Sequence, residues 1–298
     1  MTPSEREALL SRWSDPPSDT EQTRCDNAER VIKNAIAKSA LLKDRDIRVF
    51  VQGSYRNNTN VRLDSDVDIC VCLMDTFITD YTFADGLSDA ALGLIGSTYP
   101  YSQFRNDLEA ALVAAFGRVN VKRGNKAFDI KENTYRVDAD VVACWEYRRY
   151  YQNGSYASGT ALYPDNGGAI HSWPEQHRNN GVEKNNNTGR RFKRLVRIMK
   201  NLCNALTEQG NVAAKPIPSF LNECLVWNTP DHLIMDGTLS DNVRQMFIHL
   251  WQSTETDEAC KKWREVNEMK YLFRPGQPWT REQAQAWIYT AWQVLEFE

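Results

Sequence analysis

Two aspartates with one residue between them, Asp66 and Asp68, are the first group in the sequence whose type and spacing point to chemistry. They begin an apolar stretch at 66–74 that is typical of a β-strand, in which side chains two positions apart share a face. Two adjacent carboxylates repel each other unless a cation lies between them. Hard oxygen ligands in this arrangement suit Mg²⁺, which also takes phosphate oxygens. The pair therefore predicts a site for a divalent metal and a phosphate.

A second acidic pair, Asp138 and Asp140, repeats this pattern in a strand expected from Tyr135 to Glu146. One of the two can complete a three-carboxylate site for two metal ions. Such a site polarises an attacking hydroxyl group and stabilises charge on an α-phosphate and on the pyrophosphate that leaves. The residues alone do not decide between Asp138 and Asp140.

A glycine–serine turn, Gly53-Ser54, lies between the acidic strand and an earlier strand at 46–52. Glycine allows the backbone to approach a ligand closely, and the N–H groups of a turn can bind an anion. The Ser54 hydroxyl adds a donor, so the turn is a candidate seat for the β- and γ-phosphates. A DxD pair or a Gly-Ser turn is common by itself. The combination of strand, turn, acidic strand and later acidic strand is much more specific.

The surrounding pattern predicts an α+β protein in which a mixed sheet with helices is followed by a helical C-terminal lobe. A capping box at Ser18–Glu21 begins an amphipathic helix that runs to about Ser39. Further expected elements are a helix through 104–115 that Gly117 stops, strands within 119–131, a loop-rich connection at 152–190 with a short strand or two, and helices at 189–209, 218–227, 241–252, 257–269 and 280–295. We expect two domains, a catalytic core with the N-terminal helix at 1–187 and the helical lobe at 188–298.

The composition limits the partners. Lys and Arg number 36 against 39 Asp and Glu, a formal charge of −3, whereas proteins that coat duplex nucleic acid are usually far more basic. No stable binding to DNA or RNA is therefore expected. The sequence has no apolar run long enough to span a membrane and no signal peptide in its first residues. Seven scattered cysteines without a CxxC pair are typical of reduced thiols, so we expect a cytoplasmic protein, and a monomer.

The motifs together resemble the DNA polymerase β-like nucleotidyltransferase superfamily and, within it, the bacterial cGAS/DncV-like nucleotidyltransferases, closest to the clade called E. The resemblance covers about residues 18 to 230. Its motifs are the run Gln52 to Asn60, the run Asp64 to Asp68, Ala139-Asp140-Val141-Val142, Trp173-Pro174-Glu175-Gln176-His177, Asn180-Gly181, Lys184-Asn185 and the run Pro218 to Leu225.

The resemblance implies a polymerase β-like nucleotidyltransferase fold that uses two Mg²⁺ ions, with Mn²⁺ as an alternative. Family members join nucleoside triphosphates into cyclic di- or trinucleotide second messengers for anti-phage (CBASS-type) defence, which an effector protein of the same system senses. The Ala-Asp-Val-Val pattern selects Asp140 as the third metal ligand beside Asp66 and Asp68, and makes Asp138 a neighbour. Gln52, Gly53 and Ser54 fall in the motif that binds the nucleotide.

The resemblance also assigns residues to the triphosphate and the base. A helix from Thr188 to Lys200 carries six positive charges, for which a solvated face is the default explanation. Lys200 is the exception, because the family places a triphosphate-binding lysine near this point and a serine further along, here Ser219. Phe220 either stacks on a base or packs in the core. Ser172 replaces the asparagine that precedes the aromatic–proline pair in uridine-selecting relatives, which favours purine substrates, ATP or GTP.

Two other functions stay open at this point. The chain could transfer a nucleotide to a protein or an RNA end, as other members of the superfamily do. It could instead be a nucleotide-sensing module that keeps the fold without catalysis, although such a module has little need for three mutually repelling carboxylates.

Overall fold

The computed structural model describes the chain except residues 17, 62–65, 132, 134–136 and 298. The described residues form two compact units. One contains the sheet and is built from Ser18–Arg56 and the chain up to Pro174. The other is helical and combines the N-terminal residues, a short segment that begins at Asn57, and Glu175 onward. The predicted division after residue 187 differs from this one, because α1 (Pro3–Ser14) and α5 (Pro174–Asn187) pack with the C-terminal helices.

Across the described residues, seven strands form one mixed sheet in the order β1-β2-β5-β4-β3, and β6 and β7 continue it from β5. β2 and β5 run parallel, and the other neighbours are antiparallel. The strands are β1 (Ile47–Val51), β2 (Val67–Phe83), β3 (Val121–Arg123), β4 (Phe128–Ile130), β5 (Ala139–Tyr151), β6 (Tyr156–Leu162) and β7 (Ile170–Ser172). The α+β fold class with a mixed sheet is confirmed.

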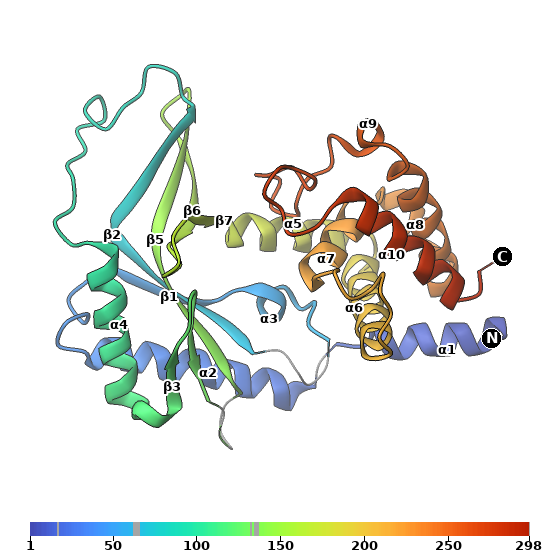
Figure 1. Cartoon of the computed structure of the whole chain (residues 1–298), viewed down its shortest axis with the longest axis horizontal. Helices are drawn as coiled ribbons and strands as arrows, with labels where there is room; N and C mark the ends of the chain where they lie inside the picture. Colours follow the sequence, from blue (N-terminus) through green and yellow to red (C-terminus); the bar gives the residue numbers. More distant parts are fainter. Residues whose placement is uncertain (17, 62–65, 132, 134–136, 298) are drawn as a thin grey trace. The chain divides into compact units, whose positions relative to one another are not determined.

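One face of this sheet is covered by α2 (Asp19–Lys38) and α4 (Tyr101–Phe116), which lie beside the strands in Figure 1. Ile32 of α2 and Leu108 of α4 are fully buried against strand residues such as Ile69 and Val141. Alternation along a strand therefore sends the neighbouring side chains to the other face. Those neighbours are Asp68, Cys70 and Cys72 on β2, and Asp140, Val142 and Cys144 on β5.

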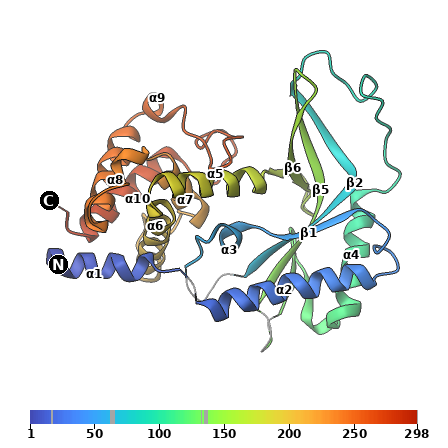
Figure 2. The ribbon, with the colours of Figure 1, turned by 180° about the vertical axis from the view of Figure 1, so that it is seen from behind.

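The helical unit has its own core. Its further helices are α6 (Arg191–Glu208), α7 (Ser219–Trp227), α8 (Leu239–Ser253), α9 (Asp257–Cys260) and α10 (Arg281–Val294). Helix α1 packs on α6 and α8, and α8 packs on α10, as Figure 2 shows from behind. Leu10 of α1, Leu195 of α6 and Trp287 of α10 are fully buried in this core. The predicted C-terminal helical lobe is confirmed.

Two predicted segments differ from the structure in kind, and one helix was not predicted. The stretch at 152–190 was expected to be mainly loop, but α5 occupies its last part, because His177, Gly181 and Lys184 lie on one buried face and packing outweighs the weak helix propensity of the asparagines. The helix expected at 257–269 ends at Cys260. Beyond it, side-chain oxygens of Asn228 and Asn267 accept backbone N–H groups that a helix would need.

The third difference is α1, which composition did not predict. Thr2 and Glu5 form a capping box at its start, and Pro3 is its first residue, a position that favours proline. None of the helices in the described part of the chain is long and apolar enough to cross a lipid bilayer. All seven cysteines are buried free thiols.

Candidate active site

Three neighbouring strands place carboxylates in one row. Asp68 on β2 is the register partner of Asp140 on the parallel strand β5, and Asp140 is the partner of Asp129 on the antiparallel strand β4. Register partners on neighbouring strands project from the same face of a sheet. Asp66 lies just before β2 and is exposed, whereas Asp68 and Asp140 are half-buried. The structure thus pairs Asp68 with Asp140, and Asp66 is close enough to both for its charge to raise their pKa values.

The carboxylates of this row raise one another's pKa values, in addition to the effect of burial. Burial raises the pKa of Asp68 to about 7, and the carboxylates of Asp140 and Asp66 add to the increase. Burial also raises the pKa of Asp140 to about 6, together with the charges of Asp66 and Asp129. The pKa of Asp66 is raised by burial and by Asp138 and Asp129. Each group resists ionisation because its neighbours carry the same charge.

The predicted phosphate turn lies directly against this row. Gly53 opens the short helix α3 (Gly53–Asn57) with a left-handed φ of 68°, and a Cβ atom placed on it would lie 2.2 Å from Oδ2 of Asp68. Gln52 is tied to the same residue, because its backbone N–H donates to the carbonyl oxygen of Asp68 over 2.8 Å. Ser54 is half-buried in the first turn of α3. Backbone and carboxylate are therefore within contact distance.

This donor set fits Mg²⁺ or Mn²⁺. Carboxylate oxygens are the ligands that such ions prefer. Because Gly53 has no side chain, its backbone can lie close to the Asp68 carboxylate, at a position that a Cβ atom would obstruct. Within the described residues, no three His, Cys, Asp or Glu side chains converge tightly enough to enclose an ion by themselves. A Mg²⁺ ion usually also takes waters and substrate phosphates as ligands.

Ser172, the predicted base-contacting residue of the sheet unit, is exposed at the end of β7. The next residue, Trp173, is 1% exposed, and its indole lies against Gly159, where a Cβ atom would be 3.0 Å away. Arg149 stacks over the Trp173 ring at 4.4 Å. The buried tryptophan therefore fixes the backbone at Ser172.

Lys200, on α6 of the helical unit, is 2% exposed and faces inward. Its ammonium lies 3.1 Å from a carboxylate oxygen of Glu223 and also donates to the backbone and side-chain oxygens of Thr59. Arg197, one turn earlier, is likewise buried and donates to backbone carbonyls of Ser14 and Asn58. The default of a solvated basic face is therefore wrong for Arg197, and Lys200, which the resemblance set apart from that face, is buried as well.

The other two predicted residues of the helical unit lie together at the start of α7. Ser219 is its first residue and is exposed. Phe220 is half-buried, with its ring centroid 5.8 Å from that of His177 and 6.0 Å from that of Trp279. Packing therefore accounts for part of the Phe220 ring, and the structure leaves its role toward a base as a prediction.

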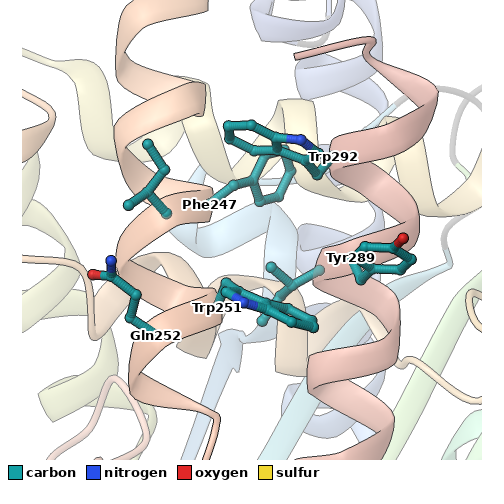
Figure 3. Close-up of a pocket in the computed structure, with 7 residues that line it drawn as sticks. Phe247, Trp251, Gln252, Tyr289 and Trp292 are labelled. Atoms are coloured by element: carbon teal, nitrogen blue, oxygen red, sulfur yellow. The ribbon is translucent and has the colours of Figure 1, made fainter. Parts of the chain in front are cut away.

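A separate cavity of about 350 Å³ opens between α8 and α10 (Figure 3). Phe247, Trp251, Tyr289 and Trp292 form much of its wall, and its lining contains no charged residue. It also contains none of the predicted site residues, so it has neither the carboxylates nor the cations that a triphosphate requires.

Two residues of the site were missed. Asp129 is flanked by buried Phe128 and Ile130, and this apolar–acidic–apolar alternation within a predicted strand was the available signal. Glu223, 3% exposed on α7, gave no such signal, because its partners come from distant parts of the chain. Its position in the run Pro218 to Leu225 was the sole indication.

The mixed sheet, the paired carboxylates and the glycine turn against them define a nucleotidyltransferase. Residues 179–296 match the family model for the cGAS/DncV-like nucleotidyltransferase C-terminal helical domain. The chain is 47% identical over 292 residues to a cyclic dipyrimidine nucleotide synthase, CdnE, of Legionella pneumophila, covering 97% of this chain and 98% of that protein. The chain therefore belongs to the cGAS/DncV-like nucleotidyltransferases.

Two solved structures match almost the whole chain. The Elizabethkingia meningoseptica CdnE cyclic dinucleotide synthase with GTP and Apcpp has a TM-score of 0.81 at 34% identity, over 98% of this chain and 99% of that one. The Rhodothermus marinus CdnE c-UMP-AMP synthase with Apcpp and Upnpp has a TM-score of 0.85 at 30% identity, over 98% of both chains.

Proposed function

We propose that this protein joins two nucleoside triphosphates into a cyclic dinucleotide, with two divalent cations at Asp66, Asp68 and Asp140. The observation that carries the proposal is the register pairing of Asp68 with Asp140 beside the Gly53 turn. The three relatives described above are cyclic nucleotide synthases, which supports a cyclic product.

Each transfer forms one bond and breaks one bond. A sugar hydroxyl oxygen attacks the α-phosphorus, the bond from that phosphorus to the bridging oxygen breaks, and pyrophosphate leaves. Asp66 and Asp68 would hold the cations, which neutralise charge on the phosphates. Asp140, the register partner of Asp68, would help to activate the attacking hydroxyl. A second transfer in the opposite direction closes the ring.

Several residues are candidates for binding the triphosphate. We assign its phosphates to the backbone of the Gly53 turn that follows Gln52, the Ser54 hydroxyl, the Lys200 ammonium and the Ser219 hydroxyl. In this assignment Phe220 and Ser172 contact the base. Exposed Ser219 and half-buried Ser54 both present hydroxyl donors, and neutral and charged donors together are the usual means of binding phosphate.

The proposal also concerns which two bases the cyclic dinucleotide contains. Ser172 in place of asparagine favours purines, whereas the 47% identical relative is named a dipyrimidine synthase. We propose that at least one of the two bases is a pyrimidine, because that relative is 47% identical to this chain, whereas a relative named a cyclic dipurine nucleotide synthase is 35% identical. The proposal further includes a role in anti-phage signalling, in which an effector protein senses the product. It also takes the enzyme to be monomeric and cytoplasmic.

The direct test incubates the protein with all four labelled nucleoside triphosphates and Mg²⁺, followed by phosphatase treatment and mass spectrometry. A phosphatase-resistant cyclic dinucleotide that contains uridine or cytidine is expected, and Asp68→Asn should make none. Label transferred to protein or RNA would instead favour the alternative acceptor. A wild-type protein that yields no resistant product from any mixture would refute cyclic dinucleotide synthesis.

A further inference from the structure

A buried carboxylate, Glu223, occupies the centre of a polar cluster in the helical unit. It is 3% exposed and receives three hydrogen bonds: from the Thr59 hydroxyl over 2.9 Å, from the Lys200 ammonium over 3.1 Å and from His177 Nε2 over 2.8 Å. Its partners come from three different segments, which are α5, α6 and the stretch that follows α3. We call Glu223, Lys200, Thr59 and His177 the Glu223 cluster.

Lys200 has no uncommitted proton in this arrangement. An ammonium group carries three N–H donors. They are matched by the Thr59 carbonyl at 3.1 Å, the Thr59 hydroxyl at 3.2 Å and Glu223 at 3.1 Å. The Thr59 hydroxyl in turn donates a hydrogen bond to Glu223, so the three residues form a closed ring of hydrogen bonds. A phosphate oxygen that reaches Lys200 must therefore replace one of these acceptors.

Burial of an isolated carboxylate is costly, and the partners compensate for it. Burial alone would raise the pKa of Glu223, but the Lys200 ammonium and His177 hold it well below its ordinary value. The group is thus ionised at neutral pH and fixes the ammonium by charge as well as by geometry. Removing one partner of such a pair leaves the other buried and uncompensated.

The segments that the Glu223 cluster joins are those that carry the proposed phosphate contacts. Thr59 lies shortly after α3, which begins with Gly53 and Ser54. Ser219 is one turn before Glu223 on α7, and the next residue, Phe220, packs on His177. A general structural ion pair would have no reason to coincide with these positions.

We propose that Glu223 is a positioning residue, which holds the Lys200 ammonium and the Thr59 segment in place for the terminal phosphates of the nucleotide. The inference rests on the proposed function, and it assigns Glu223 no contact with substrate. It predicts that Glu223 determines how well the protein distinguishes a triphosphate from a monophosphate.

The test compares Glu223→Gln with a matched control, Glu265→Gln. Glu265 is also a buried carboxylate of the helical unit, 5% exposed, and accepts from Arg274, Asn267 and Gln277. For each variant, thermal stability is measured with binding of a non-hydrolysable nucleoside triphosphate and of the corresponding monophosphate. Glu223→Gln should weaken triphosphate binding about tenfold and leave monophosphate binding unchanged, whereas Glu265→Gln should change neither.

Thr59→Val provides a second, milder perturbation if Glu223→Gln does not fold, because it removes one hydroxyl and keeps the shape. It should weaken triphosphate binding about threefold, with KM raised and the monophosphate unaffected. Glu223→Asp should recover part of the loss. Equal weakening for triphosphate and monophosphate, or the same behaviour as Glu265→Gln, would overturn the inference. A wild-type protein that binds no triphosphate would refute the proposed function instead.

Discussion

Replacing Gly53 with alanine isolates the contact between the phosphate turn and Asp68. Gly53 has a φ of 68°, and its absent Cβ would lie 2.2 Å from Oδ2 of Asp68. Real Cβ atoms almost never approach another atom closer than 3.0 Å, so the carboxylate oxygen must retreat by at least 0.8 Å. The substitution therefore moves a proposed metal ligand without altering its charge.

The expected effects on stability and on activity differ in size. A left-handed conformation costs a residue with a Cβ about 1–2 kcal/mol, and the Asp68 carboxylate can rotate away at little further expense. That amounts to a loss of about 2–4 °C in melting temperature per kcal/mol. Activity should fall by about 100-fold, because Mg²⁺ demands near-ideal geometry and a displacement of about 1 Å can remove that much rate.

Gly117→Ala is the matched control. Gly117 is in the same unit and has a φ of 81°, but a Cβ there would meet nothing within 4 Å. It should lose similar stability and keep kcat within about twofold of the wild type. Pyrophosphate release under saturating Mg²⁺ and nucleotide measures kcat, and thermal melting measures stability. If Gly53→Ala retained the activity of Gly117→Ala, the contact at Asp68 would have no part in catalysis.

Three further predictions concern charge and metal. In metal-free protein, Asp68→Asn should raise the melting temperature, because it relieves repulsion from Asp140 and Asp66. Adding Mg²⁺ should then raise the melting temperature of the wild type but not that of the variant. Equal shifts on adding Mg²⁺ would contradict a metal site at Asp68. Chelation of divalent metal should abolish product formation, and Mg²⁺ or Mn²⁺ should restore it. The far-ultraviolet circular dichroism spectrum should stay unchanged, because the strands pair through backbone hydrogen bonds. Loss of this spectrum on chelation would mean that the metal has a structural role. Because the folded pKa of Glu223 lies below its ordinary 4.5, its charge stabilises the fold fully above pH 4.5 and less as pH falls below it. The difference in urea-unfolding free energy between the wild type and Glu223→Gln should therefore shrink between about pH 5 and pH 3, and a constant difference would show that the Glu223 charge does not stabilise the protein.

The acidic row was predictable because it depends on local rules. Strand alternation alone places Asp66 and Asp68 on one face, and the same rule applied to Asp140 put it on the face opposite Val141. That the two strands are neighbours, so that Asp68 pairs with Asp140, is a non-local fact that periodicity cannot supply. The resemblance supplied it, and the structure shows the pairing.

What the sequence did not reveal are contacts between distant segments. Arg197 was expected to belong to a solvated basic face, because its partners Ser14 and Asn58 are separated from it by 183 and 139 residues along the chain. Helix α5 was hidden by its asparagines, whose local preference opposes the helix that packing enforces. In both cases tertiary contacts outweighed the local pattern. Such contacts cannot be predicted from the residues of a single helical turn or strand.

Helix α1 packs against segments that lie far from it along the chain. Arg6 donates to the carbonyl of Leu295, and Glu7 accepts backbone N–H groups at the start of α8. During synthesis α1 leaves the ribosome long before α8 and α10 exist, so its apolar residue Leu10 has no native partner in those helices until they have been made. A chain that stops before residue 281 would lack α10 and would therefore carry an unfinished helical core.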